Sequence, residues 1–197
     1  LVALIDGLLE DQAEEVALVD EAALLRYAYR VAGTVGLLMC HVLDCHAPAA
    51  RAHAIDLGIA MQLTNIARDV LEDAGMNRRY IPADWVGGAG PADIRAAAQD
   101  PGSPLCRDVT DAVGRLLDLA ESFYASGAMG YRYLPMRAHL AIAVAARVYR
   151  QIGIQLREHD LAWHDGRQVT SKATKLRCSL LALASFHHRM GAPDAGH

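Results

Sequence analysis

The chain has 197 residues, of which 53% are hydrophobic and 21% charged, and this globular composition excludes a disordered or fibrous protein. Its formal net charge is −4 and lysine and arginine form no block, so no nucleic-acid partner is expected. No uninterrupted apolar run reaches the ~20 residues that span a bilayer, and no signal peptide is recognisable, so a cytoplasmic location is expected. Alanine and leucine are abundant while runs of β-branched residues are rare, which favours helices.

Capping residues and hydrophobic periodicity predict a series of helices, without strands, internal repeats or linkers between domains. The predicted helices cover, in chain order, residues 1–15 (the end of a helix), 21–43, 48–73, 93–99, 104–126, 135–156 and 171–190. Asp20 is a suitable N-cap for the second helix, Pro48 lies in the first turn of the third, and Gly75 follows as a stop signal. We expect one all-α domain over residues 1–197.

The chain begins at Leu1, partway into an amphipathic pattern that continues through Leu4 and Leu8. This start predicts a fragment whose original N-terminus is missing. The helical bundle is therefore expected to be incomplete at its N-terminal end.

The cysteines show no pattern typical of disulfides or metal sites. They are Cys40, Cys45, Cys106 and Cys178. Without a CxxC pair, free thiols in a reducing compartment are predicted. His41 and Cys45 lie four residues apart and could share a metal, but a zinc site needs four converging ligands and the neighbouring Cys40 and His46 leave that helix face. Ordinary helix-packing residues are the favoured interpretation.

Two glycines interrupt the helix predicted over residues 21–43, in the segment Gly33-Thr34-Val35-Gly36. Each costs a helix about 1 kcal/mol relative to alanine. Such a segment is expected where the glycines give close contact with another helix, or a kink that makes room for a ligand.

The strongest chemical signal is a row of oxygen-bearing side chains on the helix predicted over residues 48–73. Its members are Gln62, Asn65, Asp69 and Asp73. Their spacings of 3, 4 and 4 residues place them on one helix face. Two carboxylates four residues apart repel each other, and a divalent cation such as magnesium removes that repulsion while it shares phosphate oxygens of a substrate. An ordinary solvated face is the alternative, but it does not require the two amides in register.

Arg78 and Tyr80 follow on a loop near the C-terminal end of the carboxylate helix. An arginine there is able to pair with a diphosphate, and the tyrosine hydroxyl to donate a hydrogen bond to it. The alternative is a surface loop whose arginine only balances the charges of Glu72 and Asp73.

Two segments of the chain match patterns of a known enzyme family in residue type and spacing. The first is Tyr27-Ala-Tyr29-Arg30-Val31-Ala32-Gly33-Thr34-Val35-Gly36. The second, whose spacing holds over 26 residues, is Leu57-Gly58-x3-Gln62-x2-Asn65-Ile66-x-Arg68-Asp69-x3-Asp73-x4-Arg78-x-Tyr80-x-Pro82. Both resemble signatures of the squalene/phytoene synthase family, and the first is most similar to bacterial phytoene synthases. Later segments also resemble these enzymes, namely Leu134-Pro135-x-Arg137 and Val148-Tyr149-Arg150-x-Ile152.

The resemblance implies an isoprenoid-synthase-type helical bundle with a central cavity. It also implies a magnesium-dependent prenyltransferase, with manganese as a possible substitute. The implied reaction is the head-to-head condensation of two geranylgeranyl diphosphates to phytoene through a cyclopropyl diphosphate intermediate, a step of carotenoid biosynthesis. Because substrate and product are apolar, peripheral association with a membrane is expected. No oligomeric state is implied.

The resemblance further implies roles for individual residues. The implied catalytic residues are Asp69, Asp73 and Tyr80, and the implied metal ligands are Asn65, Asp69 and Asp73. The implied substrate-binding residues are Tyr27, Arg30, Val31, Gly33, Val35, Gly36, Gln62, Arg68 and Arg78. Of these, the expected lining of the hydrocarbon tunnel is Tyr27, Val31, Gly33, Val35 and Gly36. Lys172 and Lys175 are further candidates for the diphosphate, although solvated lysines are the simpler interpretation.

The chain departs from the family pattern because nothing in it matches the family's first aspartate-rich motif. The acidic stretch over residues 6–15 does not replace that motif, since it lies directly before the Tyr27 segment, where the family has a different segment. With half of the metal cage absent, the 197-residue chain alone is predicted to be inactive. Smaller departures are Ala28 where cysteine is common and Asn77 where glycine usually precedes the arginine.

Other functions stay open on the sequence. A squalene, dehydrosqualene or hydroxysqualene synthase would act on farnesyl diphosphate, and cavity depth, which sets product length, is not visible in a sequence pattern. The chain could instead be a catalytically inactive helical binding subunit, although the intact Asp69 and Asp73 speak against this. A plain helical scaffold leaves the register from Gln62 to Asp73 unexplained.

Overall fold

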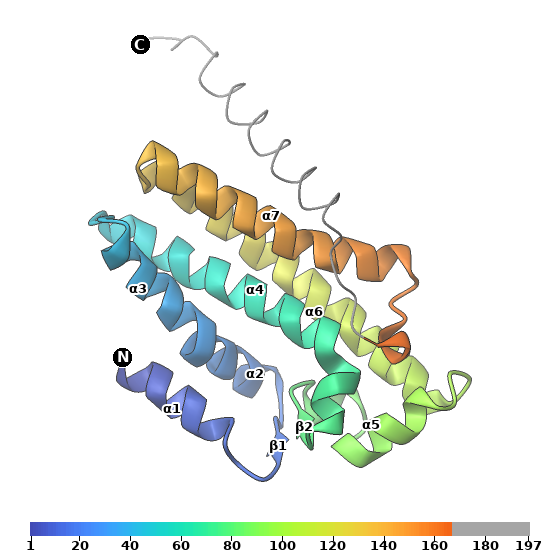
Figure 1. Ribbon diagram of the computed structural model, residues 1–197. Coiled ribbons are helices and arrows are strands. Elements are labelled where there is room, and N and C mark those ends of the chain that lie inside the picture. The colour runs from blue at the N-terminus through green and yellow to red at the C-terminus, as the bar shows by residue number, and fades with distance from the viewer. Residues whose placement is uncertain (167–197) are drawn as a thin grey trace.

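A computed structural model describes residues 1–166 of the chain (Figure 1). Its α-helices are α1 (Val2–Glu10), α2 (Glu21–Ala28), α3 (Thr34–Val42), α4 (Pro48–Gly75), α5 (Pro91–Ala98), α6 (Pro104–Met129) and α7 (Met136–Glu158). A π-helical turn (Tyr29–Gly33) joins α2 to α3, and 3-10 turns cover Ala83–Trp85, Gly130–Tyr133 and Trp163–Asp165. Two short strands are β1 (Val16–Ala17) and β2 (Arg78–Arg79).

Helix α4 is the centre of the bundle and contacts α3, α5, α6 and α7. Figure 1 shows α3 on one side of α4, α6 and α7 on the other, and α5 near the end where α4 finishes. Much of the core lies between α4 and α6, whose apolar residues recur at three- and four-residue steps. Completely buried examples are Leu63 and Ala67 on α4 and Val109, Val113 and Leu116 on α6. The predicted all-α fold is confirmed.

Local capping signals set the helix ends. Asp20 caps α2, as predicted, because its Oδ1 accepts a hydrogen bond from the amide of Ala23 at 2.7 Å. Pro48 is the first residue of α4. After α4, Asn77 has a φ of 60°, a left-handed conformation that suits glycine and that asparagine tolerates. The asparagine that stands in place of the family's usual glycine is therefore compatible with this turn.

The helix predicted over residues 21–43 is interrupted by the π-helical turn. This turn contains one residue more than an α-helical turn. The hydroxyl of Thr34, the first residue of α3, donates a hydrogen bond back to the carbonyl of Arg30 in this turn at 2.6 Å. The turn ends at Gly33, where the glycine-containing segment begins. A distortion of the helix was one of the two features expected of this segment.

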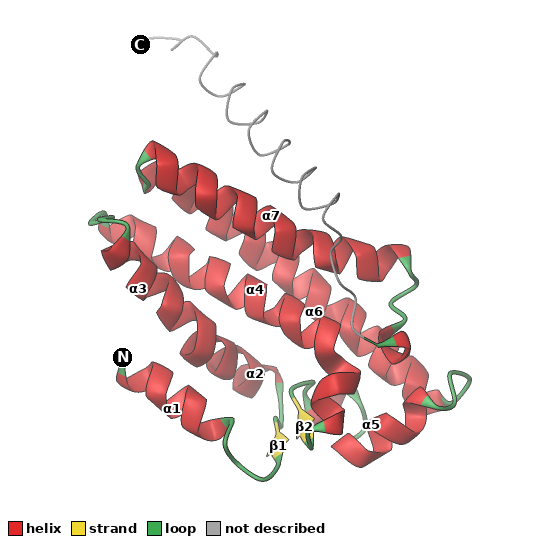
Figure 2. Cartoon of the chain, viewed as in Figure 1, coloured by secondary structure: helices red, strands yellow, loops and turns green. Residues whose placement is uncertain are grey.

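Strands β1 and β2 form a parallel pair that the sequence did not predict (Figure 2). Val16 lies opposite Arg78, and Ala17 lies opposite Arg79. The amide of Leu18 extends the pair by donating to the carbonyl of Arg79 at 3.1 Å. Strands of two residues are too short for an alternation of apolar and polar residues to appear. The pair joins the segment after α1 to the segment after α4.

Some predicted elements differ from the structure or lie outside it. The first helix ends at Glu10, not near residue 15, because the chain then turns toward β1. The helix predicted over residues 171–190, with Lys172 and Lys175, lies outside the described residues. Among the helices of residues 1–166, none is both long enough and apolar enough to cross a bilayer.

Candidate active site

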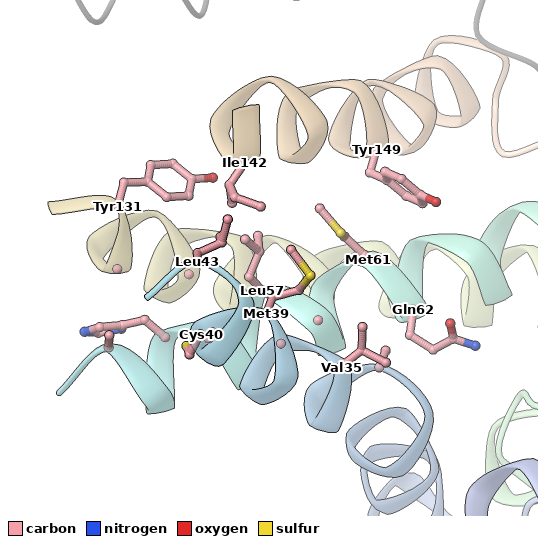
Figure 3. A pocket seen from close by; sticks show the side chains of 18 of the residues that line it. Val35, Met39, Cys40, Leu43, Leu57, Met61, Gln62, Tyr131, Ile142 and Tyr149 are labelled. Carbon is pink, nitrogen blue, oxygen red and sulfur yellow. The ribbon is translucent and has the colours of Figure 1, made fainter. Parts of the chain in front are cut away.

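An apolar cavity of about 290 Å³ lies between α3, α4, α6 and α7 (Figure 3). Its apolar lining includes Val35, Met39, Leu43, Leu57, Met61 and Ile142. Figure 3 shows Gln62 at one end of the cavity and Tyr131 at the opposite end, with Met61 between them. The Gln62 end is the end nearer the carboxylates, because α4 continues from there toward Asp69 and Asp73.

Two glycines allow the backbones beside the cavity to touch. A Cβ atom on Gly36 would lie 2.1 Å from the carbonyl oxygen of Ala54, and one on Gly58 would lie 2.3 Å from the carbonyl oxygen of Ala32. No larger residue fits at either position without a shift of the backbone. The close helix contact, the other outcome expected of the glycine-containing segment, is therefore present at Gly36.

Asn65 supplies an unpaired acceptor at the polar end of the cavity. Both Gln62 and Asn65 line the cavity. The Oδ1 atom of Asn65 is buried and has no hydrogen-bond partner among the described residues. Leaving a buried acceptor unpaired costs about 1–3 kcal/mol. A cation or a donor from a ligand would satisfy this oxygen.

Asp69 is paired with its neighbour Arg68. The Nε and Nη2 atoms of Arg68 donate to the two carboxylate oxygens of Asp69 at 2.7 and 2.5 Å. Both side chains are largely buried, with 13% and 16% of their surface exposed. In this bidentate ion pair the positive charge of Arg68 balances the negative charge of Asp69.

Asp73, one turn further along α4, lies in a more negative environment. Burial raises the pKa of this carboxyl to about 7, and the carboxylates of Asp69, Glu72 and Asp11 act in the same direction. The guanidinium of Arg78 opposes the rise only in part. A bound divalent cation would supply the positive charge that Asp73 lacks.

Tyr27 and Tyr80 meet beside the end of the carboxylate row. Their rings stack with centroids 4.7 Å apart. Tyr80 donates a hydrogen bond to the carboxylate of Asp11 at 2.7 Å, and Tyr27 donates to the same carboxylate at 3.0 Å. Asp73, Arg78 and Tyr80 line one small crevice at the C-terminal end of α4. The structure therefore brings the predicted loop residues next to the second aspartate of the row.

Some predicted substrate-binding residues lie at the cavity and one is held elsewhere. Those that line the cavity are Val31, Val35, Gly36 and Gln62. Arg30 is not among the lining residues, because its guanidinium forms an ion pair with Glu10 of α1. The role of Arg30 in substrate binding stays a prediction.

Tyr27 and Gly33 are likewise absent from the lining of this cavity, so their role in the hydrocarbon tunnel stays a prediction. Tyr27 is buried and stacks on Tyr80. Gly33 instead packs against α4, where an added Cβ would lie 3.1 Å from the side chain of Ile55.

The residues of α4 fit a divalent cation that is shared with a diphosphate. Asp69 and Asp73 offer carboxylate oxygens, and the unpaired Oδ1 of Asn65 offers a neutral one. Within residues 1–166, no group of three or more histidine, cysteine, aspartate or glutamate side chains converges on one point. The remaining ligands of such a cation would therefore include phosphate oxygens or water.

Asp11 was not predicted as a site residue, because the acidic stretch over residues 6–15 does not match the family's first aspartate-rich motif. The two tyrosines that donate to Asp11 lie 16 and 69 residues away. No local spacing signals contacts over such separations. The apolar lining residues Met39 and Met61 were also missed, because helical periodicity does not distinguish a cavity-facing side chain from a core-facing one.

Sequence comparisons relate the chain to one enzyme family. The family model for squalene/phytoene synthases matches residues 1–175. A 15-cis-phytoene synthase of Paracoccus sp. is 40% identical over 195 residues, which cover 98% of this chain and 60% of that protein. A phytoene synthase of Pseudescherichia vulneris is 42% identical over 158 residues, which cover 80% of this chain and 50% of that protein. The chain thus spans about half the length of the curated relatives that it matches.

Solved structures have the same isoprenoid-synthase fold. A crystal structure of a dehydrosqualene synthase in complex with ligand matches with a TM-score of 0.79 at 25% identity, covering 95% of this chain and 65% of that one. The squalene synthase HpnC from Alicyclobacillus acidocaldarius matches with a TM-score of 0.70 at 22% identity, covering 81% of this chain and 59% of that one. With a family model that covers most of its length, the chain belongs to the squalene/phytoene synthase family.

Proposed function

We propose that this protein acts in the head-to-head condensation of two geranylgeranyl diphosphates to phytoene through a cyclopropyl diphosphate intermediate. The observation that carries the proposal is the row from Gln62 to Asp73, which begins at the polar end of an apolar cavity. The 40% and 42% identical relatives are named phytoene synthases, whereas the matching squalene-type structures are 25% identical or less. These identities favour geranylgeranyl over farnesyl diphosphate as the substrate.

The reaction would use two parts of the site, the polar row on α4 with the loop after it, and the apolar wall of the cavity. Asn65, Asp69 and Asp73 would hold magnesium or manganese, and the cation when bound neutralises the charge that develops on the departing diphosphate. Arg78 and Tyr80 would offer a cationic and a hydroxyl donor to the same diphosphate. The apolar wall would keep water away from the allylic carbocation that remains.

The proposal is tested with the protein as its gene encodes it. Radiolabelled geranylgeranyl and farnesyl diphosphates are supplied separately with magnesium, and the hydrocarbon is identified by mass spectrometry. We expect phytoene from geranylgeranyl diphosphate, and no product from the Asp69→Asn variant. A C30 hydrocarbon from farnesyl diphosphate alone would reassign the substrate. Binding of either diphosphate without turnover would identify an inactive binding subunit.

We also propose that the 197-residue chain alone does not catalyse this reaction. It contains one aspartate-rich motif, at Asp69 and Asp73, where the family resemblance implies two. Release of pyrophosphate from geranylgeranyl diphosphate by the purified chain is the measurement. Steady release that requires Asp73 would refute this proposal.

Peripheral association with a membrane is proposed because the substrate and the product are both apolar. Co-sedimentation with liposomes of neutral and anionic lipid measures it. Protein that stays in the supernatant with both kinds of liposome would overturn the proposal.

A further inference from the structure

Asp11 joins three segments of the chain that are distant in sequence. It is the C-cap residue that follows α1. Its carboxylate accepts hydrogen bonds from Tyr27 of α2 and from Tyr80, which follows β2. Its backbone carbonyl accepts a hydrogen bond from Nη2 of Arg78 at 2.8 Å. The segment that contains Arg78 and Tyr80 is the one that borders Asp73.

The carboxylate of Asp11 is held by neutral donors and not by an ion pair. Its hydrogen-bond donors, the hydroxyls of Tyr27 and Tyr80, are neutral. No arginine, lysine or histidine among residues 1–166 forms an ion pair with it, and Arg78 reaches only its backbone. Neutral donors satisfy the lone pairs of a carboxylate without cancelling its charge. That charge acts on Asp73, whose pKa it helps to raise.

Contacts on either side of Asp11 hold it in this position. Before it, Glu10 forms the ion pair with Arg30 of the π turn. After it, the side-chain amide of Asn77 donates to the carbonyl of Glu14 at 2.9 Å, and the parallel pair of β1 and β2 begins at Val16. The loop after α1 is therefore joined to the loop after α4, and the chain makes contacts on both sides of Asp11.

We propose that Asp11 is a positioning residue of the diphosphate site. It holds the hydroxyls of Tyr27 and Tyr80 beside the Asp73 end of the row on α4. Its charge strengthens the attraction of Asp69 and Asp73 for the cation that accompanies a diphosphate. The inference rests on the proposed function, because the site is the one formed by Asp69 and Asp73. The ligand class is magnesium with a diphosphate group.

The test measures binding of magnesium and inorganic pyrophosphate to the 197-residue chain by isothermal titration calorimetry. Asp11→Asn removes the charge and keeps the shape of the side chain. Glu14→Gln is the matched control, because it removes the same charge from an exposed side chain of the same loop. We expect Asp11→Asn to weaken binding about tenfold and Glu14→Gln to weaken it less than about twofold, since a partly buried charge close to a site acts more strongly than a solvated one.

The affinity of the folded Asp11→Asn protein for magnesium pyrophosphate distinguishes a positioning role from a purely structural one. If Asp11 had only a structural role, its substitution would lower the unfolding temperature but leave this affinity unchanged. Equal affinities of Asp11→Asn and Glu14→Gln would overturn the inference while the proposed function stands. Absence of binding by the unaltered chain would instead count against the proposed magnesium–diphosphate site. If Asp11→Asn does not fold, all three proteins are compared in trimethylamine N-oxide, which favours the folded state.

Discussion

At the scale of single residues, the two aspartates of α4 have unequal surroundings. Asp69 receives both donors of Arg68, whereas Asp73 lies among carboxylates and has a raised pKa. The row is therefore short of positive charge at its Asp73 end. This imbalance is typical of a site that is completed by a cation.

Replacing Asp73 with asparagine should affect stability and binding in opposite directions. Without metal, Asp73→Asn removes an uncompensated negative charge, so we expect the unfolding temperature to rise by about 3 °C at pH 8. The same change should abolish the calorimetric signal of magnesium pyrophosphate. Glu14→Gln is the control, because that side chain is exposed and is not among the groups that shift the pKa of Asp73. Loss of stability together with retained binding would contradict the assignment.

The raised pKa of Asp73 also predicts a dependence of stability on pH. The folded state holds this proton up to about pH 7, whereas an unfolded aspartate loses it near pH 3.9. The resulting stabilisation is complete below about pH 4 and is lost as the pH rises through about 7. Calorimetry in EDTA should therefore show a smaller difference in unfolding temperature between about pH 5.5 and 8 for Asp73→Asn than for the unaltered protein. Equal differences in unfolding temperature for the two proteins would show that the pKa of Asp73 is not raised.

At the scale of elements, the cavity depends on two helices that touch through their backbones. Gly36 and Gly58 allow this contact, and the π turn lies directly before α3. Strands β1 and β2 act at the other end, where they join the loops that contain Asp11 and Tyr80.

We expect Gly58→Ala to destabilise the protein by about 3 kcal/mol, because its Cβ would overlap the carbonyl of Ala32 and force the helices apart. Gly75→Ala is the matched control, since an added Cβ meets nothing within 4 Å at the end of the same helix. That control should change the free energy of unfolding by less than about 1 kcal/mol. Urea unfolding measures both, and equal effects would show that the helix contact is not the cause.

At the scale of the whole molecule, helices α3, α4, α6 and α7 surround an apolar space, and Gln62 and Asn65, the first two members of the row on α4, line its polar end. A prenyl diphosphate contains the same two parts, a charged group and a hydrocarbon chain. Binding of the diphosphate and binding of the hydrocarbon should therefore respond to different substitutions.

Met61→Trp is expected to affect binding of the hydrocarbon chain but not binding of the diphosphate. Met61 points into the middle of the cavity (Figure 3), so a larger side chain there should weaken binding of farnesyl thiodiphosphate at least about tenfold by filling the space. Affinity for inorganic pyrophosphate should be unchanged. Met76→Trp, at an exposed position beyond α4, serves as the control. Calorimetry measures both ligands, and equal losses for both would show that the cavity does not receive the hydrocarbon chain.

The sequence by itself determined the helices, their capped ends and the row on α4. These features depend on contacts within one helical turn, such as the cap from Asp20 to Ala23 and the four-residue step from Asp69 to Asp73. Short-range periodicity and residue chemistry record such contacts directly. The family resemblance then joined the row to a fold and a reaction, and the comparisons confirmed the family.

Only the tertiary structure decided what lies around that row. The stacking of Tyr27 on Tyr80, and the hydrogen bonds of both to Asp11, join residues up to 69 positions apart. Tyr27 stacks on Tyr80 and Gly33 packs against Ile55 of α4, and periodicity within a regular helix predicts neither these contacts nor the extra residue of the π turn. Which polar groups lie unpaired or uncompensated, as Asn65 and Asp73 do, depends on burial, which only the packing of α4 against its neighbours sets.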